Sequence, residues 1–341
     1  NSSRVSFAIN AHDKLSGEAN QIGLYEGILF DNGREQVRFT MDNISYENTR
    51  NINAHIDYKL RSNGGSWLQH LSELPGYLNG IYKISAGDGV VDLSDGSVHE
   101  IRIVVKDAYG NSSEQSFKIQ YSLPATPGWT YPGKMFYPLM MNIGDAGDDC
   151  EFYIGEKGLY DSAHINYVRS STAGADIISA THTIGTTAIP IQDTLVVRLK
   201  PTLALSGEQM DRTVMERISG NGMEVVKAIW RNGWALGKFR DFGSFRLVVD
   251  DSPPLIAPVG WKNGANLARL GRITIAVRDN LSKYKNFRAE LDGKWLRFTN
   301  DKGKSFIYKF DERCPPGKHQ LKIHVEDEAG NSSEQWFSFV R

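Results

Sequence analysis

The histidines are the residues that could do acid–base or metal chemistry in this chain, and their spacing decides whether they do. There are eight, at positions 12, 55, 70, 99, 164, 182, 319 and 324. A zinc site needs three or four nitrogen, oxygen or sulfur ligands within tetrahedral reach. The sequence holds no His-x-His, no His-Glu-x-x-His and no Cys-x-x-Cys. The spacing therefore predicts no metal-binding residue in this chain.

No catalytic constellation stands out either. His55 and Asp57 would face the same side of a strand, so a metal or catalytic pair is one interpretation, and a framework hydrogen bond is the simpler one. His99 and His319 occupy equivalent positions in two related segments, which favours a structural role for both. The sequence has no Gly-x-Ser-x-Gly nucleophile elbow and no glycine-rich phosphate loop. We therefore predict no catalytic residue.

Acidic turns and aromatic residues remain as candidates for binding. Residues 85–97 and 145–151 could offer carboxylate oxygens to calcium, but Gly- and Asp-rich stretches are also ordinary turns. Exposed aromatic rings could stack on sugars or dock a partner protein, with packing between domains as the alternative. The candidate binding residues are Trp129, Tyr131, Phe136, Tyr137, Trp230 and Trp234.

Two segments of the chain are related in sequence and indicate a domain that occurs twice. Residues 99–120 and 319–340 align without gaps, and eleven of the twenty-two positions are identical. Apolar and polar residues alternate on both sides of an Asp-x-x-Gly-Asn turn, which is typical of a closing β-hairpin. Weaker parallels upstream, such as FAINAHDKLSG with IAVRDNLSK and DNGREQVRFT with DGKWLRFT, extend the repeat to a whole domain.

Short strands of this spacing, with few helical stretches, predict an all-β protein of three tandem immunoglobulin-like β-sandwich domains. The first covers residues 1–122, and the third, which is related to it, covers 252–341. The middle domain, 123–251, is a divergent sandwich that begins with a Pro- and aromatic-rich linker. Its expected strands are 150–154, 164–170, 193–199 and 224–230, with a short helix at 210–218. Hairpin turns are expected at Asn32-Gly33, Asn232-Gly233 and Asp292-Gly293.

Composition indicates an ordinary globular protein. Of the 341 residues 40% are hydrophobic and 23% are charged, and the net charge is −1. This balance gives no global field that would attract nucleic acid, and no apolar run reaches the roughly 18 residues of a membrane-spanning helix. The two cysteines, Cys150 and Cys314, fall in different domains and are expected to be isolated thiols, with a bridge between them as the alternative.

Several stretches together resemble the region that follows the catalytic domain in lysostaphin-like (LytM-type) zinc metallopeptidases of Gram-negative envelopes. They run through all three domains, and include FAINAHDKLSG, RFTMDNISYENTRNINAHIDY, HEIRIVVKDAYGN, RDFGSFRLVVDDSPP, YKFDERCPPGKH and HVEDEAGN. The enzyme of that family cuts peptidoglycan cross-bridge peptides with zinc held by His-x-x-x-Asp and His-x-His motifs. Neither motif occurs here. The resemblance therefore implies a non-catalytic region without a cofactor of its own, whose zinc peptidase domain would lie upstream of Asn1.

The resemblance implies an accessory region that positions the enzyme, shields its cleft or docks it to a protein partner or to peptidoglycan, in the periplasm or cell envelope. The residues alone leave a second interpretation open, a stand-alone immunoglobulin-like binding or adhesion protein that recognises a glycan or a protein. The sandwich fold hosts both functions, so it does not separate them. An enzyme in its own right is disfavoured because the motif search fails.

Overall fold

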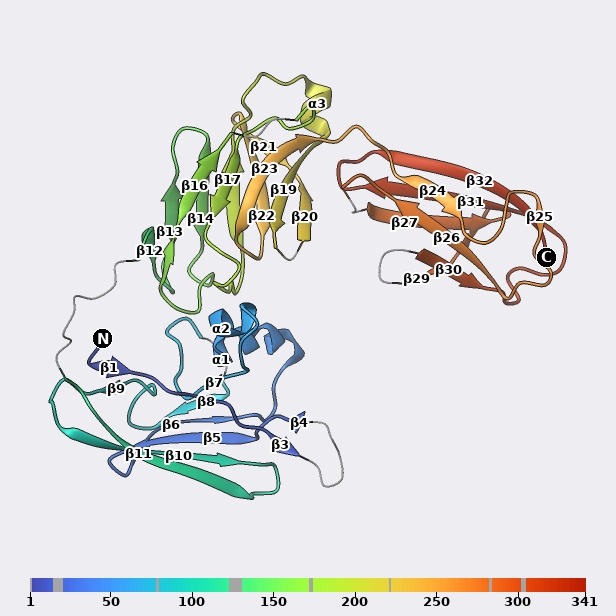
Figure 1. The fold of residues 1–341 in the computed structure, drawn as a ribbon. Helices are drawn as coiled ribbons and strands as arrows, with labels where there is room; N and C mark the ends of the chain where they lie inside the picture. The colour runs from blue at the N-terminus through green and yellow to red at the C-terminus, as the bar shows by residue number, and fades with distance from the viewer. Residues whose placement is uncertain are drawn as a thin grey trace.

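Three β-sandwich domains follow one another along the chain (Figure 1). The structure is a computed structural model that describes residues 2–14, 21–77, 80–122, 131–171, 174–220, 222–281, 284–301 and 305–341. The first and second domains lie against each other, and the third extends from the opposite end of the second (Figure 1). The expected fold class, an all-β protein of immunoglobulin-like sandwiches, is confirmed. In the described residues, every helix is far too short to cross a membrane.

The first domain is built on one five-stranded sheet that is covered by shorter elements. Its elements are β1 (Arg4–Val5), β2 (Ala8–Ile9), β3 (Asp13–Lys14), β4 (Gln21–Ile22), β5 (Glu26–Asp31), β6 (Arg34–Thr40), η1 (Tyr46–Asn51), α1 (Ile52–His55), α2 (Tyr58–Ser62), β7 (Gln69–His70), β8 (Tyr82–Ile84), β9 (Val91–Asp92), β10 (Val98–Lys106) and β11 (Ser112–Gln120). The sheet order is β11-β10-β5-β6-β8, and β1 pairs with β9, β2 with β7 and β3 with β4.

The second domain is a sandwich of two five-stranded sheets. Its elements are β12 (Lys134–Phe136), β13 (Asn142–Asp145), β14 (Cys150–Ile154), β15 (Ala163–Ile165), β16 (Tyr167–Ser170), β17 (Thr181–Ile184), β18 (Leu195–Leu199), α3 (Gly207–Asp211), β19 (Thr213–Ser219), β20 (Gly222–Lys227), β21 (Ile229–Arg231), β22 (Trp234–Phe239) and β23 (Gly243–Val249). One sheet has the order β13-β14-β18-β22-β21 and the other β16-β17-β23-β19-β20, with β12 and β15 as a separate pair.

The third domain, which is related to the first by sequence, is a sandwich of a four-stranded and a five-stranded sheet. Its elements are β24 (Leu255–Pro258), β25 (Ala265–Asn266), β26 (Arg272–Arg278), β27 (Tyr284–Leu291), β28 (Lys294–Leu296), β29 (Thr299–Asp301), β30 (Ser305–Lys309), β31 (Lys318–Asp327) and β32 (Ser332–Val340). The sheets are β24-β26-β30-β29 and β25-β32-β31-β27-β28. The short β25 runs parallel to β32, whereas the other strand pairs described in this domain are antiparallel.

Three expectations within the second domain need correction. The strand expected at 164–170 is divided between β15, which pairs with β12, and β16, which pairs with β17. The helix expected at 210–218 is wrong, because α3 ends at Asp211 and Thr213–Ser219 is strand β19. This strand lies between β20 and β23, and Thr213 to Glu216 are all buried, so no polar face shows in the sequence pattern. The expected strand at 224–230 is split between the two sheets, since β20 pairs with β19 and β21 pairs with β22.

The turn and cysteine expectations are confirmed. Asn32, Asn232 and Asp292 all have positive φ angles of 49–51°, and each is followed by a glycine at 76–78°. This left-handed pair of conformations is what a two-residue hairpin turn of the mirror-image type requires. Both cysteines are free and buried, and burial raises the pKa of the Cys150 thiol to about 12 and that of Cys314 to about 11.

Candidate functional site

The aromatic candidates of the linker do not form one site. Trp129 lies outside the described residues. Phe136 is wrong as a binding residue, because its side chain is 1% exposed and stacks on Phe152 in the core of the second domain. Tyr131 and Tyr137 are exposed, and the Tyr131 ring stacks on His164 with 5.5 Å between ring centroids. These two tyrosines remain available to a partner.

The two tryptophans of the β21–β22 hairpin point in different directions. Trp230 packs against the core of the second domain, and its indole N–H donates a hydrogen bond to the Met210 carbonyl at 2.9 Å. Trp230 therefore packs inside the protein, which is the alternative to its expected role in binding. Trp234 instead lies beside two cations, with the Arg198 guanidinium 5.0 Å and the Lys200 ammonium 4.5 Å from its ring centroid. Such stacking favours a fixed ring orientation.

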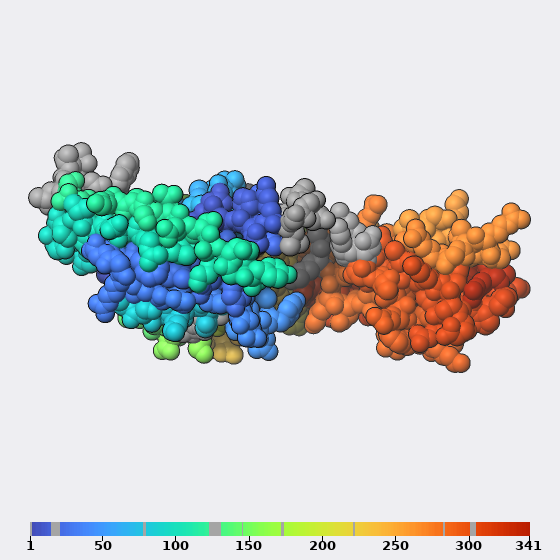
Figure 2. Space-filling view, turned by 90° about the horizontal axis from the view of Figure 1, so that it is seen from below, coloured from blue at the N-terminus to red at the C-terminus, as the bar shows by residue number. Residues whose placement is uncertain are grey.

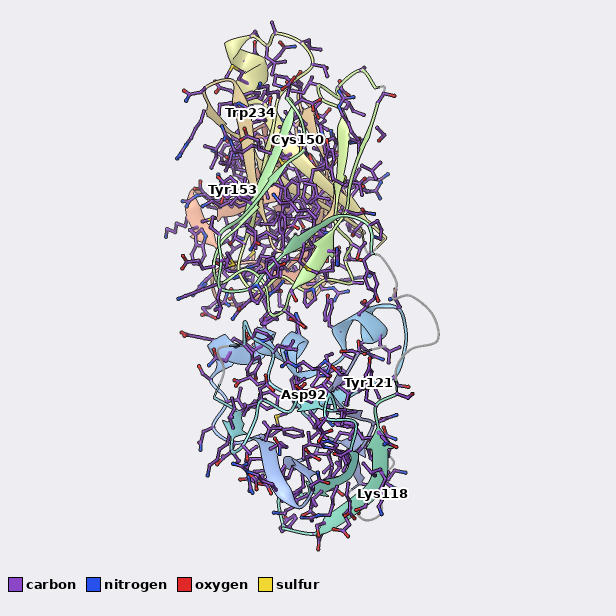
Figure 3. All side chains as sticks on the ribbon, turned by 90° about the vertical axis from the view of Figure 1, so that its left-hand side faces the viewer. Asp92, Lys118, Tyr121, Cys150, Tyr153 and Trp234 are labelled. Carbon is purple, nitrogen blue, oxygen red and sulfur yellow. The ribbon has the colours of Figure 1, made fainter. Side chains whose placement is uncertain are left out.

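Trp234 belongs to the outer surface of the β13-β14-β18-β22-β21 sheet. Residues alternate along these strands, so the side chains that do not enter the core share one outer face. We call this surface the Trp234 face; Figure 3 labels Trp234 and Tyr153 in the domain that carries it. It comprises Ile143, Glu151, Tyr153, Val196, Arg198, Lys200, Ile229, Arg231, Trp234, Leu236 and Lys238. Ile143 and Ile229 are 60% and 49% exposed, so the face offers apolar area among its cations.

The junction of the first and second domains is closed by Tyr160. This residue belongs to the second domain, yet its side chain is 2% exposed and packs in the core cluster of the first. Its hydroxyl donates to the Arg50 carbonyl and the Asn51 side-chain oxygen, both at 3.2 Å. In return the Arg50 guanidinium donates to the carbonyls of Ile191 at 3.1 Å and Arg240 at 2.9 Å.

This junction was not predicted because it rests on a helical insertion that the sequence reading missed. Arg50 and Asn51 lie in η1, which with α1 and α2 follows β6. Capping residues were the signal that could have revealed these short helices. The Ser45 side chain accepts from the Glu47 N–H, and the Asp57 carboxylate accepts from the Leu60 N–H at 2.9 Å.

The repeated Asp-x-x-Gly-Asn segments are self-bonded turns, as the sequence indicates. The Asp327 carboxylate accepts from the backbone N–H and the side-chain amide of Asn331, both at 2.8 Å. Asp107 accepts in the same way from Asn111, at 2.9 and 2.6 Å. The intervening glycine has a φ of 89° in the first turn and 88° in the second, a conformation that glycine adopts without strain.

The two turns nevertheless have different surroundings. Ala329 is 1% exposed and packs with Val214, Val225 and Val248 of the second domain. Its carbonyl accepts from the Lys227 ammonium at 2.6 Å. Tyr109, at the equivalent position of the first domain, is 91% exposed. The turn of the third domain therefore closes the second junction, a role that its sequence does not reveal.

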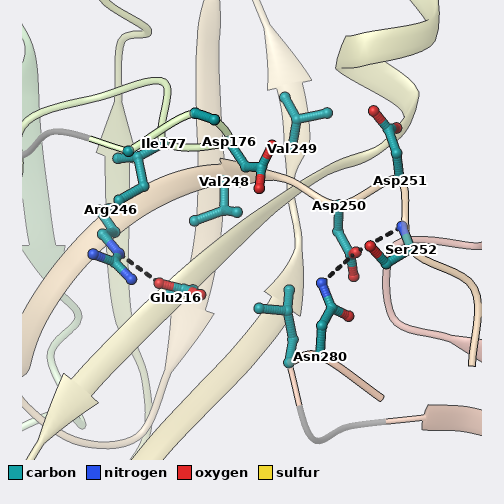
Figure 4. A pocket seen from close by; sticks show the side chains of 13 residues that line it. Asp176, Ile177, Glu216, Arg246, Val248, Val249, Asp250, Asp251, Ser252 and Asn280 are labelled. Carbon is teal, nitrogen blue, oxygen red and sulfur yellow. Dashed lines mark hydrogen bonds and ion pairs between the residues drawn. The ribbon is translucent and has the colours of Figure 1, made fainter.

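Three carboxylates meet at this second junction. Atoms of Asp250, Asp279 and Asp327 lie within 4.8 Å of one another, and among the described residues this group alone has the arrangement of a possible metal site. Carboxylate oxygens are the ligands that Ca²⁺ prefers. The Asp250 carboxylate accepts from Ser252 N–H at 3.1 Å and from Asn280 at 2.9 Å, beside a hollow of about 270 Å³ (Figure 4). Burial raises the pKa of Asp250, and Asp327 raises it further.

The acidic segments that the sequence offered for calcium are ordinary turns where the structure describes their contacts. Asp88, Asp92 and Asp95 each accept a hydrogen bond from the backbone N–H two residues later, at 2.9–3.0 Å. In the segment 145–151, the Asp149 carboxylate forms an ion pair with Arg169 at 2.8 Å. None of these residues belongs to the three-carboxylate group.

The histidines of interest serve the framework. Buried His55 forms hydrogen bonds with the Tyr82 hydroxyl at 2.9 Å and the Gln69 oxygen at 3.2 Å, and burial lowers its pKa to about 4. Asp57 caps α2 instead of pairing with it, so the framework interpretation is confirmed. His99 and His319 each form a hydrogen bond with a carboxylate at the neighbouring hairpin turn, 2.9 Å to Asp31 and 2.7 Å to Asp292.

Comparisons with known proteins match one domain by sequence and the whole chain only weakly by fold. Residues 142–250 match the family described as a Zu5-like domain. No curated protein matches the chain.

Three solved structures illustrate the fold likeness. An endo-beta-1,4-mannanase from Thermotoga petrophila is 11% identical with a TM-score of 0.23, over 27% of this chain and 20% of that chain. The fibronectin(III)-like modules of Clostridium thermocellum CbhA are 10% identical with a TM-score of 0.20, over 51% and 93%. The Bacteroides ovatus mixed-linkage glucan utilization locus SGBP-B is 9% identical with a TM-score of 0.18, over 99% and 64%. This chain thus spans less than two thirds of the mannanase and SGBP-B chains, and TM-scores this low carry no functional conclusion.

Proposed function

We propose that this chain is the non-catalytic accessory region of a peptidoglycan-directed zinc endopeptidase, which it positions or docks in the periplasm or cell envelope. In this proposal the zinc belongs to a catalytic domain upstream of the chain. The observation that carries the positioning role is that buried side chains, Tyr160 and Ala329, close both domain junctions. We infer from these buried contacts that the domains keep a fixed orientation, which a positioning arm requires.

Some residues of the junctions, though not Tyr160, lie in the stretches that resemble the peptidase-associated region. RFTMDNISYENTRNINAHIDY contains Arg50 and Asn51, and HVEDEAGN contains Ala329. RDFGSFRLVVDDSPP contains both Arg240 and Asp250, one from each junction. Part of each junction therefore lies in the stretches that carry the resemblance, which supports the proposal.

The native gene product provides the first test. We expect an intact mass above the 38.1 kDa of this chain, stoichiometric zinc, and His-x-x-x-Asp and His-x-His motifs upstream of Asn1. A native product of 38.1 kDa with no peptidase encoded upstream would exclude the accessory role.

A variant of the same native product tests positioning. Tyr160→Ala should loosen the first junction, reduce the release of fragments from intact peptidoglycan sacculi, and leave cleavage of a short soluble cross-bridge peptide unchanged. Tyr46→Ala is the matched control, because Tyr46 lies in the same helical insertion and is 90% exposed. Equal activity of the Tyr160 variant and wild type on sacculi would count against a positioning role.

The alternative function is a stand-alone binding or adhesion protein that recognises a glycan or a protein partner. The Trp234 face is the observation that favours it, since an aromatic ring flanked by cations suits an acidic glycan or an acidic protein surface. Binding to purified sacculi that falls at least tenfold in Trp234→Ala, and not in Tyr46→Ala, would support a glycan ligand. If the Trp234→Ala variant binds sacculi as well as wild type, the Trp234 face takes no part in either proposed function.

A further inference from the structure

The outer face of the five-stranded sheet of the third domain carries two exposed tryptophans. Trp295 of β28 is 57% exposed, and Trp336 of β32 is 54% exposed. The solvent face of an antiparallel sheet normally carries polar side chains, and large exposed apolar groups that occur together mark interaction sites. In Figure 2 the orange and red atoms of the third domain lie beyond the blue and green atoms of the first, which does not cover the third domain on the side shown.

The strand register places both tryptophans in one line across the sheet. Trp336 pairs with Lys322 of β31, Lys322 pairs with Glu290 of β27, and Glu290 pairs with Trp295. Side chains of directly paired residues lie on the same face, so these four residues, which we call the Trp295–Trp336 row, present one side chain per strand. The two tryptophans are three strand intervals apart, which is about 14 Å at the usual strand spacing.

Neighbouring side chains hold the Trp336 ring in place. Its indole N–H donates to the Glu334 carboxylate at 2.9 Å, and the Lys322 ammonium lies 5.3 Å from its ring centroid. Lys322 in turn forms an ion pair with Glu334 at 2.9 Å. The ring is therefore preorganised while it stays open to solvent, so a ligand that stacks on it has little side-chain entropy to remove.

The charged groups beside the two rings are paired. Lys322 pairs with Glu334, and the Arg288 guanidinium forms an ion pair with the Glu290 carboxylate at 2.8 Å. These two pairs carry no net charge, which favours an uncharged ligand, and their N–H donors and carboxylate acceptors match hydroxyl groups. Because charged groups separate the two rings, the apolar area is not continuous as it is in the dry centre of a protein–protein interface.

The related first domain forms the same sheet without tryptophan in this row. In the aligned hairpins Ser116 takes the position of Trp336. Strand pairing leads from Ser116 across the sheet to Glu35, which takes the place of Trp295. Folding of this type of sandwich therefore does not itself require an aromatic residue at either end of the row, and the two exposed indoles call for another role.

We propose that the Trp295–Trp336 row binds a linear, uncharged glycan of β-1,4-linked pyranose units, which lies across the strands. The C–H faces of the sugar rings stack on the two indoles, and the sugar hydroxyls form hydrogen bonds with the charged groups between them. A β-1,4-linked chain is extended and can contact both rings, whereas an α-1,4-linked chain coils away from a line of this length.

The shape of the sheet also limits the ligand. Neighbouring strands are rotated by about 20–25° relative to each other, so the row is twisted and suits a single soluble chain better than the flat surface of a crystalline fibre. The inference rests on the glycan-binding alternative described above. It places the ligand on a surface other than the Trp234 face, and it does not require an upstream peptidase.

The length and linkage of the ligand provide the first test. Cellohexaose and chitohexaose are the probes, titrated into the full chain in a calorimeter. We expect at least one of them to bind at least tenfold more tightly than the disaccharide of the same sugar, which is too short to contact both rings. Maltohexaose, with α-1,4 linkages, is the control and should bind at least tenfold more weakly. The proposal is overturned if neither hexasaccharide binds, or if the disaccharide or maltohexaose binds equally well.

Variants of the two tryptophans locate the site. Trp295→Ala and Trp336→Ala should each weaken binding of the hexasaccharide at least fivefold and leave the thermal midpoint unchanged, because both side chains are more than half exposed. Trp67→Ala is the matched control, since Trp67 is 43% exposed in the first domain. Wild-type affinity in both variants would refute the row. Binding that is lost only in Trp234→Ala would keep the glycan-binding function, place it on the Trp234 face, and equally refute this inference.

Discussion

Single residues link each domain of this chain to its neighbour. Tyr160 and Ala329 each belong by sequence to one domain and by packing to its neighbour. Neither is distinguishable from an ordinary turn or core residue in the sequence, because a residue's partner across a junction depends on the orientation of whole domains. The sequence therefore predicted the repeated turn correctly, but it did not reveal that the turn of the third domain packs against the second domain.

The histidine–aspartate pairs make stability depend on pH. Burial opposes protonation of His99 and His319, but hydrogen bonds to Asp31 and Asp292 outweigh it, so the pKa of each histidine is raised. When the pKa of a histidine is higher in the folded state than in the unfolded state, its protonation stabilises the fold. This stabilisation is fully present below the unfolded-state pKa of about 6.5, and it is lost as the pH rises through the folded-state pKa. We expect the thermal midpoint to fall above pH 6.5, and to fall less in the His99→Gln/His319→Gln variant.

Melting curves between pH 6 and 9 measure this effect, with His12→Gln as the control because His12 is exposed. A double variant with the full pH dependence of the wild type would show that other groups cause it.

Asp250 makes the opposite contribution at the second junction. Because burial and Asp327 raise its pKa, its ionised form costs the folded state free energy above the folded pKa. This cost disappears as the pH falls through that pKa towards the unfolded value of about 3.9. Asp250→Asn keeps an oxygen acceptor for Ser252, so we expect a higher midpoint than wild type at pH 7 and a smaller advantage at pH 5. A midpoint below wild type at both values would indicate that the charge itself is needed.

At the scale of elements, the sequence predicted turns and strands correctly where neighbouring residues alone determine the local conformation. The Asn-Gly and Asp-Gly turns need only their own positive φ angles, and the strand at Cys150–Ile154 shows strict alternation of burial. Strand β19 failed because burial on both faces removes that alternation. The candidate aromatics were only partly placed, since Phe136 and Trp230 enter the core while Trp234 does not. Composition alone cannot tell which ring the neighbouring strands will cover.

At Gly76, a loop of the first domain lies very close to the backbone of the second domain. The Gly76 N–H donates to the Tyr160 carbonyl at 2.8 Å, and a Cβ on Gly76 would lie 2.1 Å from the Leu159 carbonyl oxygen. The backbone cannot yield easily, so Gly76→Ala should destabilise the first junction by about 1–3 kcal/mol. Gly80→Ala, where a Cβ meets no atom within 4 Å, is the matched control. Faster amide exchange in residues 46–56 is the expected sign, and identical exchange in the two variants would contradict it.

At the scale of the whole molecule, the two related domains differ in what their equivalent ends touch. The turn of the third domain is buried against the second domain, while that of the first borders an open hollow of about 530 Å³. Among the described residues, β32 pairs with both β31 and β25, whereas β11 pairs with β10. The same type of turn is therefore buried at a domain junction in the third domain and exposed to solvent in the first domain.

Exchanging the residues of the two turns tests the rigid arrangement of the domains. Ala329→Tyr places a much larger side chain against Val214, Val225 and Val248, at a position where the alanine is 1% exposed. Overpacking of this kind costs about 1–3 kcal/mol, enough to populate states in which the third domain has separated from the second. Small-angle scattering should then show a broader distance distribution and a larger radius of gyration than wild type.

Tyr109→Ala is the reciprocal control for this exchange. Because Tyr109 is 91% exposed, its removal should leave the scattering curve unchanged. The Lys227 hydrogen bond to the backbone carbonyl at position 329 does not require a particular side chain, so it does not by itself hold the junction once the apolar contact fails. An Ala329→Tyr protein with the wild-type scattering curve would therefore mean that the polar contacts suffice, and that the buried alanine is not what fixes the third domain.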